Sequence, residues 1–168
     1  MLEALAAGMP AVGSDLRDRT GAADWFVHRH NFLTSDADPV CASVIMNPPY
    51  LEKGQGSEPF IRKAMSFPSV QKIAAFVPSK FLWGGDRARD FWTKLPPARV
   101  YLITPRPSCP PGPVIEAGIS PGGGFEDFAW CVWDKGSFAT WEAASQCGQA
   151  PVLRWILGPD RRKGRVKR

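Results

Sequence analysis

The apolar run Ser-Val-Ile-Met at 43–46 is followed directly by Asn47-Pro48-Pro49-Tyr50. The run is apolar and β-prone, which predicts a strand. Two successive prolines cannot donate hydrogen bonds to a β-ladder, so the strand has to end at residue 46. The sequence therefore places a rigid, polar turn directly at the carboxyl end of a strand.

Predicted strands and helices alternate around this turn, which is typical of an α/β sheet with mostly parallel strands. The last two strands are joined by a Pro- and Gly-rich loop without a helix, which predicts an antiparallel hairpin at one edge. In the second long helix, Asp86 is the expected N-cap, and Phe91 and Trp92 are expected to face inward. Beyond Gly136 the pattern weakens. Helices are predicted at 1–7, 57–67 and 86–95. Strands are predicted at 11–13, near the end of 24–33, and at 43–46, 72–77, 99–104 and 125–133.

The length of 168 residues allows one domain with a sizeable core. No stretch of about eighteen apolar residues occurs, so the sequence predicts no membrane-spanning helix. The four cysteines show no Cys-x-x-Cys spacing, so we expect reduced thiols and a cytoplasmic protein. Five tryptophans are expected to serve packing rather than base stacking: Trp83, Trp92, Trp130, Trp133 and Trp141.

The net charge of +5 comes from the end of the chain. Six of the 21 basic side chains lie in 161–168, which leaves 15 basic against 16 acidic side chains in the remainder. We therefore expect a near-neutral domain over 1–158 and a basic tail over 159–168. The tail residues Arg161, Arg162 and Lys163 are candidate phosphate contacts, while a solvated end is the default explanation of such a charge run.

The turn at 47–50 has the groups needed to hold a planar amine. Ligands of open α/β sheets bind beyond the carboxyl ends of the strands. The Asn47 carbonyl and the next backbone carbonyl can together accept both hydrogens of an exocyclic amino group, and the Tyr50 ring offers a stacking face. Accepting both hydrogens favours a more tetrahedral, more nucleophilic nitrogen, which suits attack on a methyl donor without a side-chain nucleophile.

The segment VIMNPPY (44–50) resembles motif IV of S-adenosylmethionine-dependent amino-methyltransferases, most of all the adenine-N6 DNA methyltransferases. The resemblance covers about residues 1–136. It implies a Rossmann-like class I sheet, S-adenosylmethionine as cofactor, DNA as partner, and a target base flipped out and stacked near Tyr50. The further blocks that carry it are VGSDL (12–16), HNFLTSD (30–36), 72–92, 99–112 and 125–136.

The resemblance also implies roles for single residues. Asn47, Pro48, Pro49 and Tyr50 would form the catalytic motif. Asp15 would bind the ribose hydroxyls of the cofactor.

Phe32, with Asn31 where the family has Asp, would contact the cofactor adenine. An amide can still accept a hydrogen bond from the adenine amino group. Lys80 and Arg87, near the substrate side of the predicted sheet, are modest candidates for phosphate contacts.

Motif I, the first strand of the family and its glycine-rich turn, has no counterpart, so we expect an N-terminally truncated domain. The missing strand would lie beside strand 43–46, and its loss would leave two neighbouring strands unpaired. The glycines at 122–124 precede a strand rather than a helix and are expected to form a hairpin loop. We expect the chain alone to bind the cofactor weakly or not at all.

Three alternatives stay open. The substrate could be RNA or a protein glutamine rather than DNA, since these enzymes use close variants of the tetrapeptide. The chain could instead be a non-catalytic remnant that binds nucleic acid or a partner. Last, the sequence could be a fragment whose true start lies upstream. The sequence does not indicate the oligomeric state or the recognised target.

His28 and His30 alternate, but without a third ligand they are expected to be surface histidines, and no metal site is predicted.

Overall fold

The computed structural model describes residues 8, 10–17, 25–29, 31–50, 56–110, 112–119, 124, 126–147 and 151–158. The chain forms two compact units, Met1–Pro39 and Val40–Arg168, and each is described by itself. The helix predicted at 1–7 and the tail at 159–168 lie outside the described residues.

The first unit contains a two-stranded parallel sheet of β1 (Gly13–Asp15) and β2 (Phe26–Arg29). Two strands were predicted here, but β1 begins two residues later than expected, and β2 lies in the middle of 24–33 rather than near its end. Its pairing starts where the Gly13 amide donates a 2.7 Å hydrogen bond to the Trp25 carbonyl. Because the strands are parallel, their carboxyl ends lie at the same edge of this small sheet.

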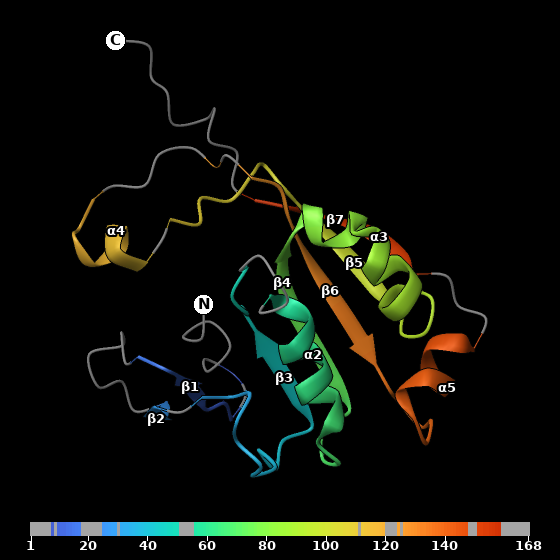
Figure 1. The fold of residues 1–168 in the computed structure, drawn as a ribbon. Helices are drawn as coiled ribbons and strands as arrows, with labels where there is room; N and C mark the ends of the chain where they lie inside the picture. The colour runs from blue at the N-terminus through green and yellow to red at the C-terminus, as the bar shows by residue number, and fades with distance from the viewer. Residues whose placement is uncertain are drawn as a thin grey trace. The chain divides into compact units, whose positions relative to one another are not determined.

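The second unit contains a five-stranded sheet in the order β3-β4-β6-β5-β7 (Figure 1). Strand β3 coincides with the predicted strand at 43–46, and β5 coincides with 99–104. The bounds are β3 (Ser43–Met46), β4 (Lys72–Pro78), β5 (Arg99–Thr104), β6 (Phe128–Asp134) and β7 (Val152–Leu157).

The sheet is mixed, so the expectation of mostly parallel strands is wrong. The pairs β3–β4 and β5–β7 are parallel, whereas β6 runs antiparallel to both β4 and β5. The antiparallel pair β5–β6 was predicted, but it lies inside the sheet rather than at an edge. The reason is that β6 pairs with β4 on its other side, while β7 extends the sheet beyond β5.

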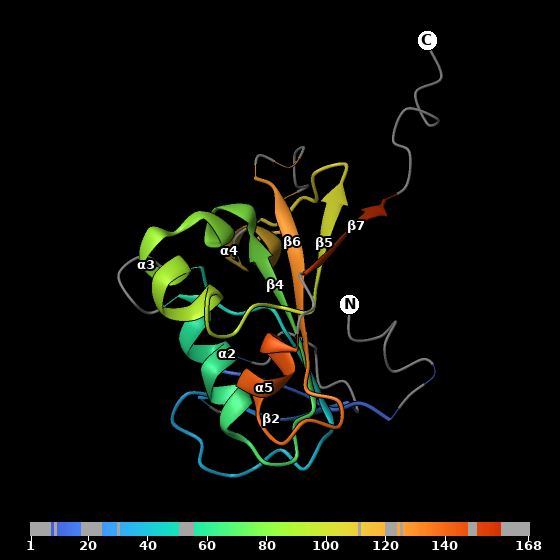
Figure 2. The ribbon, with the colours of Figure 1, turned by 90° about the vertical axis from the view of Figure 1, so that its right-hand side faces the viewer.

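Helices α2, α3 and α5 lie on one side of this sheet (Figure 2). Helix α2 (Ser57–Ser66) confirms the predicted amphipathic segment, since Ile61 and Ala64 are fully buried. Helix α2 packs against β4, whose Ile73 and Val77 are also fully buried. Trp133 belongs to the same core and donates an indole hydrogen bond of 2.9 Å to the Leu95 carbonyl.

The segment predicted as one helix at 86–95 is irregular. A 3-10 turn (Ser79–Trp83) leads into α3 (Gly85–Arg87), which continues as a π-helical turn (Ala88–Trp92). Asp86 is not the N-cap, because Gly84 takes that position and the Asp86 carboxylate pairs with Arg89 instead. Phe91 is fully buried, as predicted, and Trp92 is half-buried, whereas Trp83, expected to serve packing, is 82% exposed.

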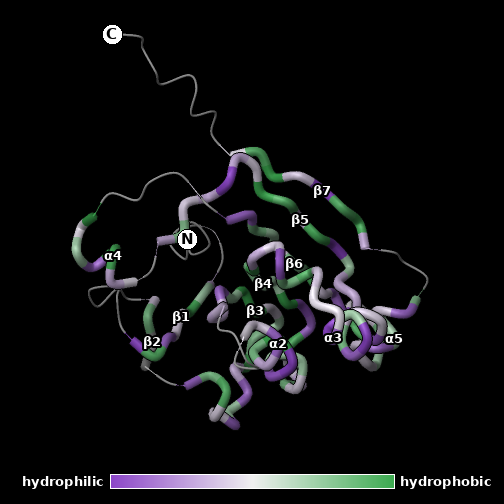
Figure 3. The backbone as a smooth tube through the Cα atoms, turned by 45° about the horizontal axis from the view of Figure 1, so that its top comes forward, coloured by the Kyte–Doolittle hydropathy of each residue, from purple (hydrophilic) through white to green (hydrophobic). Residues whose placement is uncertain are grey.

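The sequence reading missed two elements after Gly136 and one inside the hairpin loop. Helix α5 (Trp141–Gln146) is capped by the Thr140 side chain, which accepts a 3.1 Å hydrogen bond from the Ala143 amide. Strand β7 follows it, and hydrophobic positions run along both β5 and β7 (Figure 3). The short helix α4 (Gly112–Glu116) lies in the hairpin loop. No helix among the described residues is long and apolar enough to cross a membrane.

Candidate functional site

The turn at 47–50 and three other segments meet at one edge of the five-stranded sheet, namely the edge formed by the ends of its strands rather than by an outer strand. Strands β3 and β4 are parallel and both end at this edge, while the antiparallel β6 begins there. The end of β4 is tied to the start of β6 by a 2.8 Å hydrogen bond from the Ser79 amide to the Asp127 carbonyl. The loop after β5 also leaves from this edge, because β5 runs antiparallel to β6. The predicted carboxyl-edge position of the tetrapeptide is therefore confirmed.

The four residues of the turn differ in burial. Pro48 is buried, while Asn47 and Pro49 are exposed. The Pro49 carbonyl accepts a 3.4 Å hydrogen bond from the Ser57 hydroxyl, which ties the turn to the first residue of α2. The Tyr50 hydroxyl donates a hydrogen bond to Asn47 Oδ1. The turn thus presents an exposed carboxamide whose orientation is held by the tyrosine of the same motif.

The Tyr50 ring lies at the end of a row of aromatic rings. It lies 5.6 Å, centroid to centroid, from Phe128, which stacks on Phe76 at 4.8 Å with an interplanar angle of 4°. Trp130 continues the row 5.2 Å from Phe76. By strand alternation, these β4 and β6 residues occupy the sheet face opposite the helices. Phe128 was missed as a site residue; its one sequence signal is its place at the start of a strand antiparallel to the others.

The surroundings of Tyr50 disfavour negative charge. Partial burial raises the pKa of its hydroxyl, and the nearby Cys109 and Glu126 raise it further. Burial and Glu126 also raise the pKa of Cys109, which comes from the loop after β5. Tyr50 therefore stays protonated as a hydrogen-bond donor throughout the neutral range.

The two cations predicted near the substrate side each have an intramolecular partner. Lys80 Nζ lies 2.9 Å from Glu126 Oε1, so it stands close to the Tyr50 environment. The Arg87 guanidinium covers the Phe81 ring at 4.5 Å and donates a 3.0 Å hydrogen bond to the Phe81 carbonyl. Lys80 is thus at the same edge as the turn, whereas Arg87 is engaged in packing its own turn.

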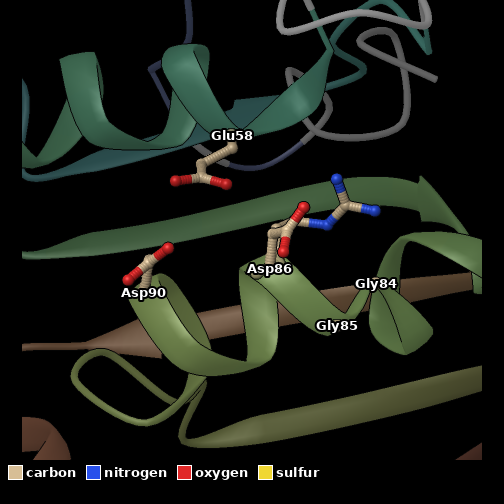
Figure 4. Close-up of a pocket in the computed structure, with 6 residues that line it drawn as sticks. Glu58, Gly84, Gly85, Asp86 and Asp90 are labelled. Carbon is tan, nitrogen blue, oxygen red and sulfur yellow. The ribbon is translucent and has the colours of Figure 1, made fainter.

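An acidic cavity of about 390 Å³ lies between the start of α2 and α3 (Figure 4). Its carboxylates are Glu58, Asp86 and Asp90, and Gly84, Gly85 and Arg87 complete the lining. Glu58 pairs with Arg62 at 2.8 Å. Three carboxylates disfavour an anionic ligand, so this cavity does not support Arg87 as a phosphate contact.

The predicted cofactor residues lie in the first unit. Asp15 ends β1 and is exposed, and its carboxylate accepts a 3.2 Å hydrogen bond from the Arg17 amide. Asn31 follows β2 at the same edge, because Asp15 pairs with Arg29. The Asn31 side-chain carbonyl accepts a 3.0 Å hydrogen bond from the Leu33 amide and so shapes the turn that contains the half-buried Phe32.

An exposed carboxylate at a strand end fits a ribose diol, and a carbonyl with a second lone pair fits the adenine amino group. These two acceptors are the groups that the sequence resemblance assigns to cofactor binding, and that assignment stays a prediction. The structure brings these three residues to one edge of the small sheet, and the tetrapeptide stands at an edge of the other unit. Arg161, Arg162 and Lys163 lie outside the described residues.

Strand β3 pairs only with β4 among the described residues, and β1 pairs only with β2. The expectation of a further strand beside residues 43–46 stays a prediction. No family model, curated protein or solved structure matches the chain.

Proposed function

We propose that the protein transfers a methyl group from S-adenosylmethionine to an exocyclic amine, with adenine N6 in DNA as the substrate. The observation that carries this proposal is the exposed Asn47 carboxamide at the carboxyl edge of the sheet, beside the Tyr50 ring that packs on Phe128. The motif resemblance supports the choice of adenine, and the basic tail supports a nucleic acid.

In this proposal the turn binds and orients the amine. Asn47 Oδ1 and the Pro48 carbonyl each accept one amine hydrogen, which localises the nitrogen lone pair for attack. Asn47 Oδ1 has two lone pairs, so it can retain the hydrogen bond from Tyr50 while accepting from the substrate. The proline ring of Pro48 is buried, which keeps its carbonyl in place without a conformational search.

The base stacks on Tyr50, whose other neighbour is Phe128. Of the predicted phosphate contacts that lie among the described residues, Lys80, 2.9 Å from Glu126, is at this edge, and it would contact a flanking phosphate. Bound S-adenosylmethionine would supply an electrophilic methyl group, with Asp15, Asn31 and Phe32 holding its adenosine half. The amine then loses one proton to solvent, so no side-chain base is required.

The test compares two carboxamide variants in the full chain. Asn47→Ala removes the proposed acceptor, and Gln71→Ala removes an amide just before β4, at the opposite edge of the same sheet. Transfer of labelled methyl groups to unmethylated DNA is measured at millimolar cofactor. We expect Asn47→Ala to lower the rate by about 100-fold or more, and Gln71→Ala to leave it within about twofold.

Retention of transfer in Asn47→Ala would contradict the proposed role of the turn. Preferential labelling of RNA or of glutamine peptides would replace DNA as the substrate while keeping the same chemistry. Absence of transfer to all three at saturating cofactor would favour the non-catalytic alternative, in which the chain binds nucleic acid or a partner.

A further inference from the structure

Strand β7 is an apolar edge strand with both faces exposed. Its sequence is Val-Leu-Arg-Trp-Ile-Leu, and all six residues are exposed. Trp155 is 62% exposed and Leu157 is 79% exposed. Strands that are apolar on both faces are typical of sheets covered on both sides. Within the described part of the chain, β7 pairs only with β5, so its other edge is open.

The backbone groups that point outward from β7 can be assigned from two hydrogen bonds. The Val152 amide donates to Ala98 at 3.0 Å, and the Gly158 amide donates to Thr104 at 2.7 Å. Backbone direction alternates along a strand, so the even-numbered residues bond toward β5. The odd-numbered residues Leu153, Trp155 and Leu157 therefore present their N–H and C=O groups along the open edge.

We propose that this edge pairs with the same edge of a second copy of the chain, antiparallel about a twofold axis. Two copies related by such an axis contact each other through the same surface, so the assembly is complete as a dimer. The pairing would join the two five-stranded sheets into one continuous sheet and remove the open edge, which otherwise templates aggregation.

The sequence of β7 selects one register for this pairing. A twofold axis perpendicular to the sheet keeps each face on its own side, so residues of the same parity lie opposite one another. With Trp155 opposite the second copy's Trp155, Leu153 lies opposite Leu157 and all outward groups pair, in roughly six hydrogen bonds. Of the two neighbouring registers, the one centred on Arg154 would place Arg154 opposite itself, and like charges directly opposite are destabilising. The one centred on Ile156 would leave Leu153 without an opposite residue within β7.

The chosen register also explains the composition of the strand. Arg154, its single charge, lies opposite Ile156 of the second copy, where its methylene stem covers apolar surface and its guanidinium reaches solvent. The two tryptophans meet at the centre of the contact, where aromatic residues contribute most to binding. A second copy is therefore complementary to this edge in hydrogen bonding, and the pairing places no like charges opposite one another.

The first test measures the mass of the full chain by light scattering over a range of concentrations. We expect a dimer whose dissociation constant rises at least about 30-fold in Trp155→Lys. The matched control is Trp83→Lys, which changes a tryptophan that is 82% exposed on a different element and is expected to leave the dimer unchanged. A monomer at all concentrations, or a dimer insensitive to Trp155→Lys, would overturn the proposal.

The second test determines the register by cross-linking. In a chain whose exposed cysteines Cys109 and Cys147 are replaced by Ser, Trp155→Cys is expected to form a reducible dimer under mild oxidation. Arg154→Cys is expected to cross-link much more slowly, because its Cα is not opposite itself. Faster cross-linking by Arg154→Cys would refute the register, and open-ended oligomers would refute the closed dimer. Slow hydrogen exchange of the Leu153 and Trp155 amides in a monomer would show that another segment covers the edge and would also overturn it.

Discussion

The ring and the hydroxyl of Tyr50 should contribute separately to substrate binding. Tyr50→Phe removes the hydroxyl that donates to Asn47 Oδ1 but keeps the ring beside Phe128. Tyr50→Ala removes both. If the base stacks on the ring, as proposed, the two variants should differ strongly in affinity for an unpaired adenine.

The expected magnitudes follow from the contacts of Tyr50. Stacking of one base on an aromatic side chain is worth about 1–3 kcal/mol, so Tyr50→Ala should weaken binding by about 5- to 160-fold. Tyr50→Phe loses one hydrogen bond to the exposed Asn47, worth about 0.5 kcal/mol, and should change the affinity by less than about threefold. The half-buried ring packs on Phe128, so Tyr50→Ala should also lower the free energy of unfolding by about 2 kcal/mol.

The assay is fluorescence anisotropy of a short labelled DNA with one unpaired adenine, repeated with the adenine replaced by an abasic site. Urea denaturation of each variant, performed in parallel, separates lost binding from lost folding. Equal losses in Tyr50→Phe and Tyr50→Ala would show that the hydroxyl, and not the ring, is what the substrate requires. An equal loss on the abasic DNA would show that Tyr50 does not contact the base, and either result would refute the stacking argument.

Three further predictions concern other parts of the chain. Burial raises the pKa of Cys131 to about 12, above the value of about 8.5 expected in the unfolded chain. The stability that the protonated thiol contributes should therefore be complete below about pH 8.5 and be lost as the pH rises above that value. Urea denaturation between pH 7 and 11 should show a free energy of unfolding that depends less on pH in Cys131→Ala. A Cβ at Gly124 would collide with the backbone carbonyl of Pro107, so Gly124→Ala should lower the melting temperature, whereas Gly85→Ala, with open space around it, should not. Truncation of the chain before residue 161 should flatten the salt dependence of DNA affinity. Lys80→Gln should reduce the slope of log affinity against log salt concentration by about one. Unchanged slopes would exclude phosphate contacts at these positions.

The sequence determined the elements whose signals are local. The strand at 43–46 ends where two prolines remove the next backbone donors, and the structure places its end at the same residue. Helix α2 was predicted from the spacing of its apolar residues, and Ile61 and Ala64 are buried as expected. The Thr140 cap of α5 is an equally local signal, although the apolar pattern around it is too weak to predict the helix. Residues close in the chain determine such features, so they can be predicted without the fold.

The tertiary structure decided the order of the strands and the surroundings of the turn. Strand β6 pairs between β4 and β5, and β7 adds outside β5; neither choice is visible in the local pattern, because pairing joins segments far apart in the chain. For the same reason the sequence indicated Tyr50 but not Phe128 or Glu126, which reach it only through the start of β6. The sequence likewise did not indicate the open edge of β7, because a strand has an edge position only once the sheet has formed.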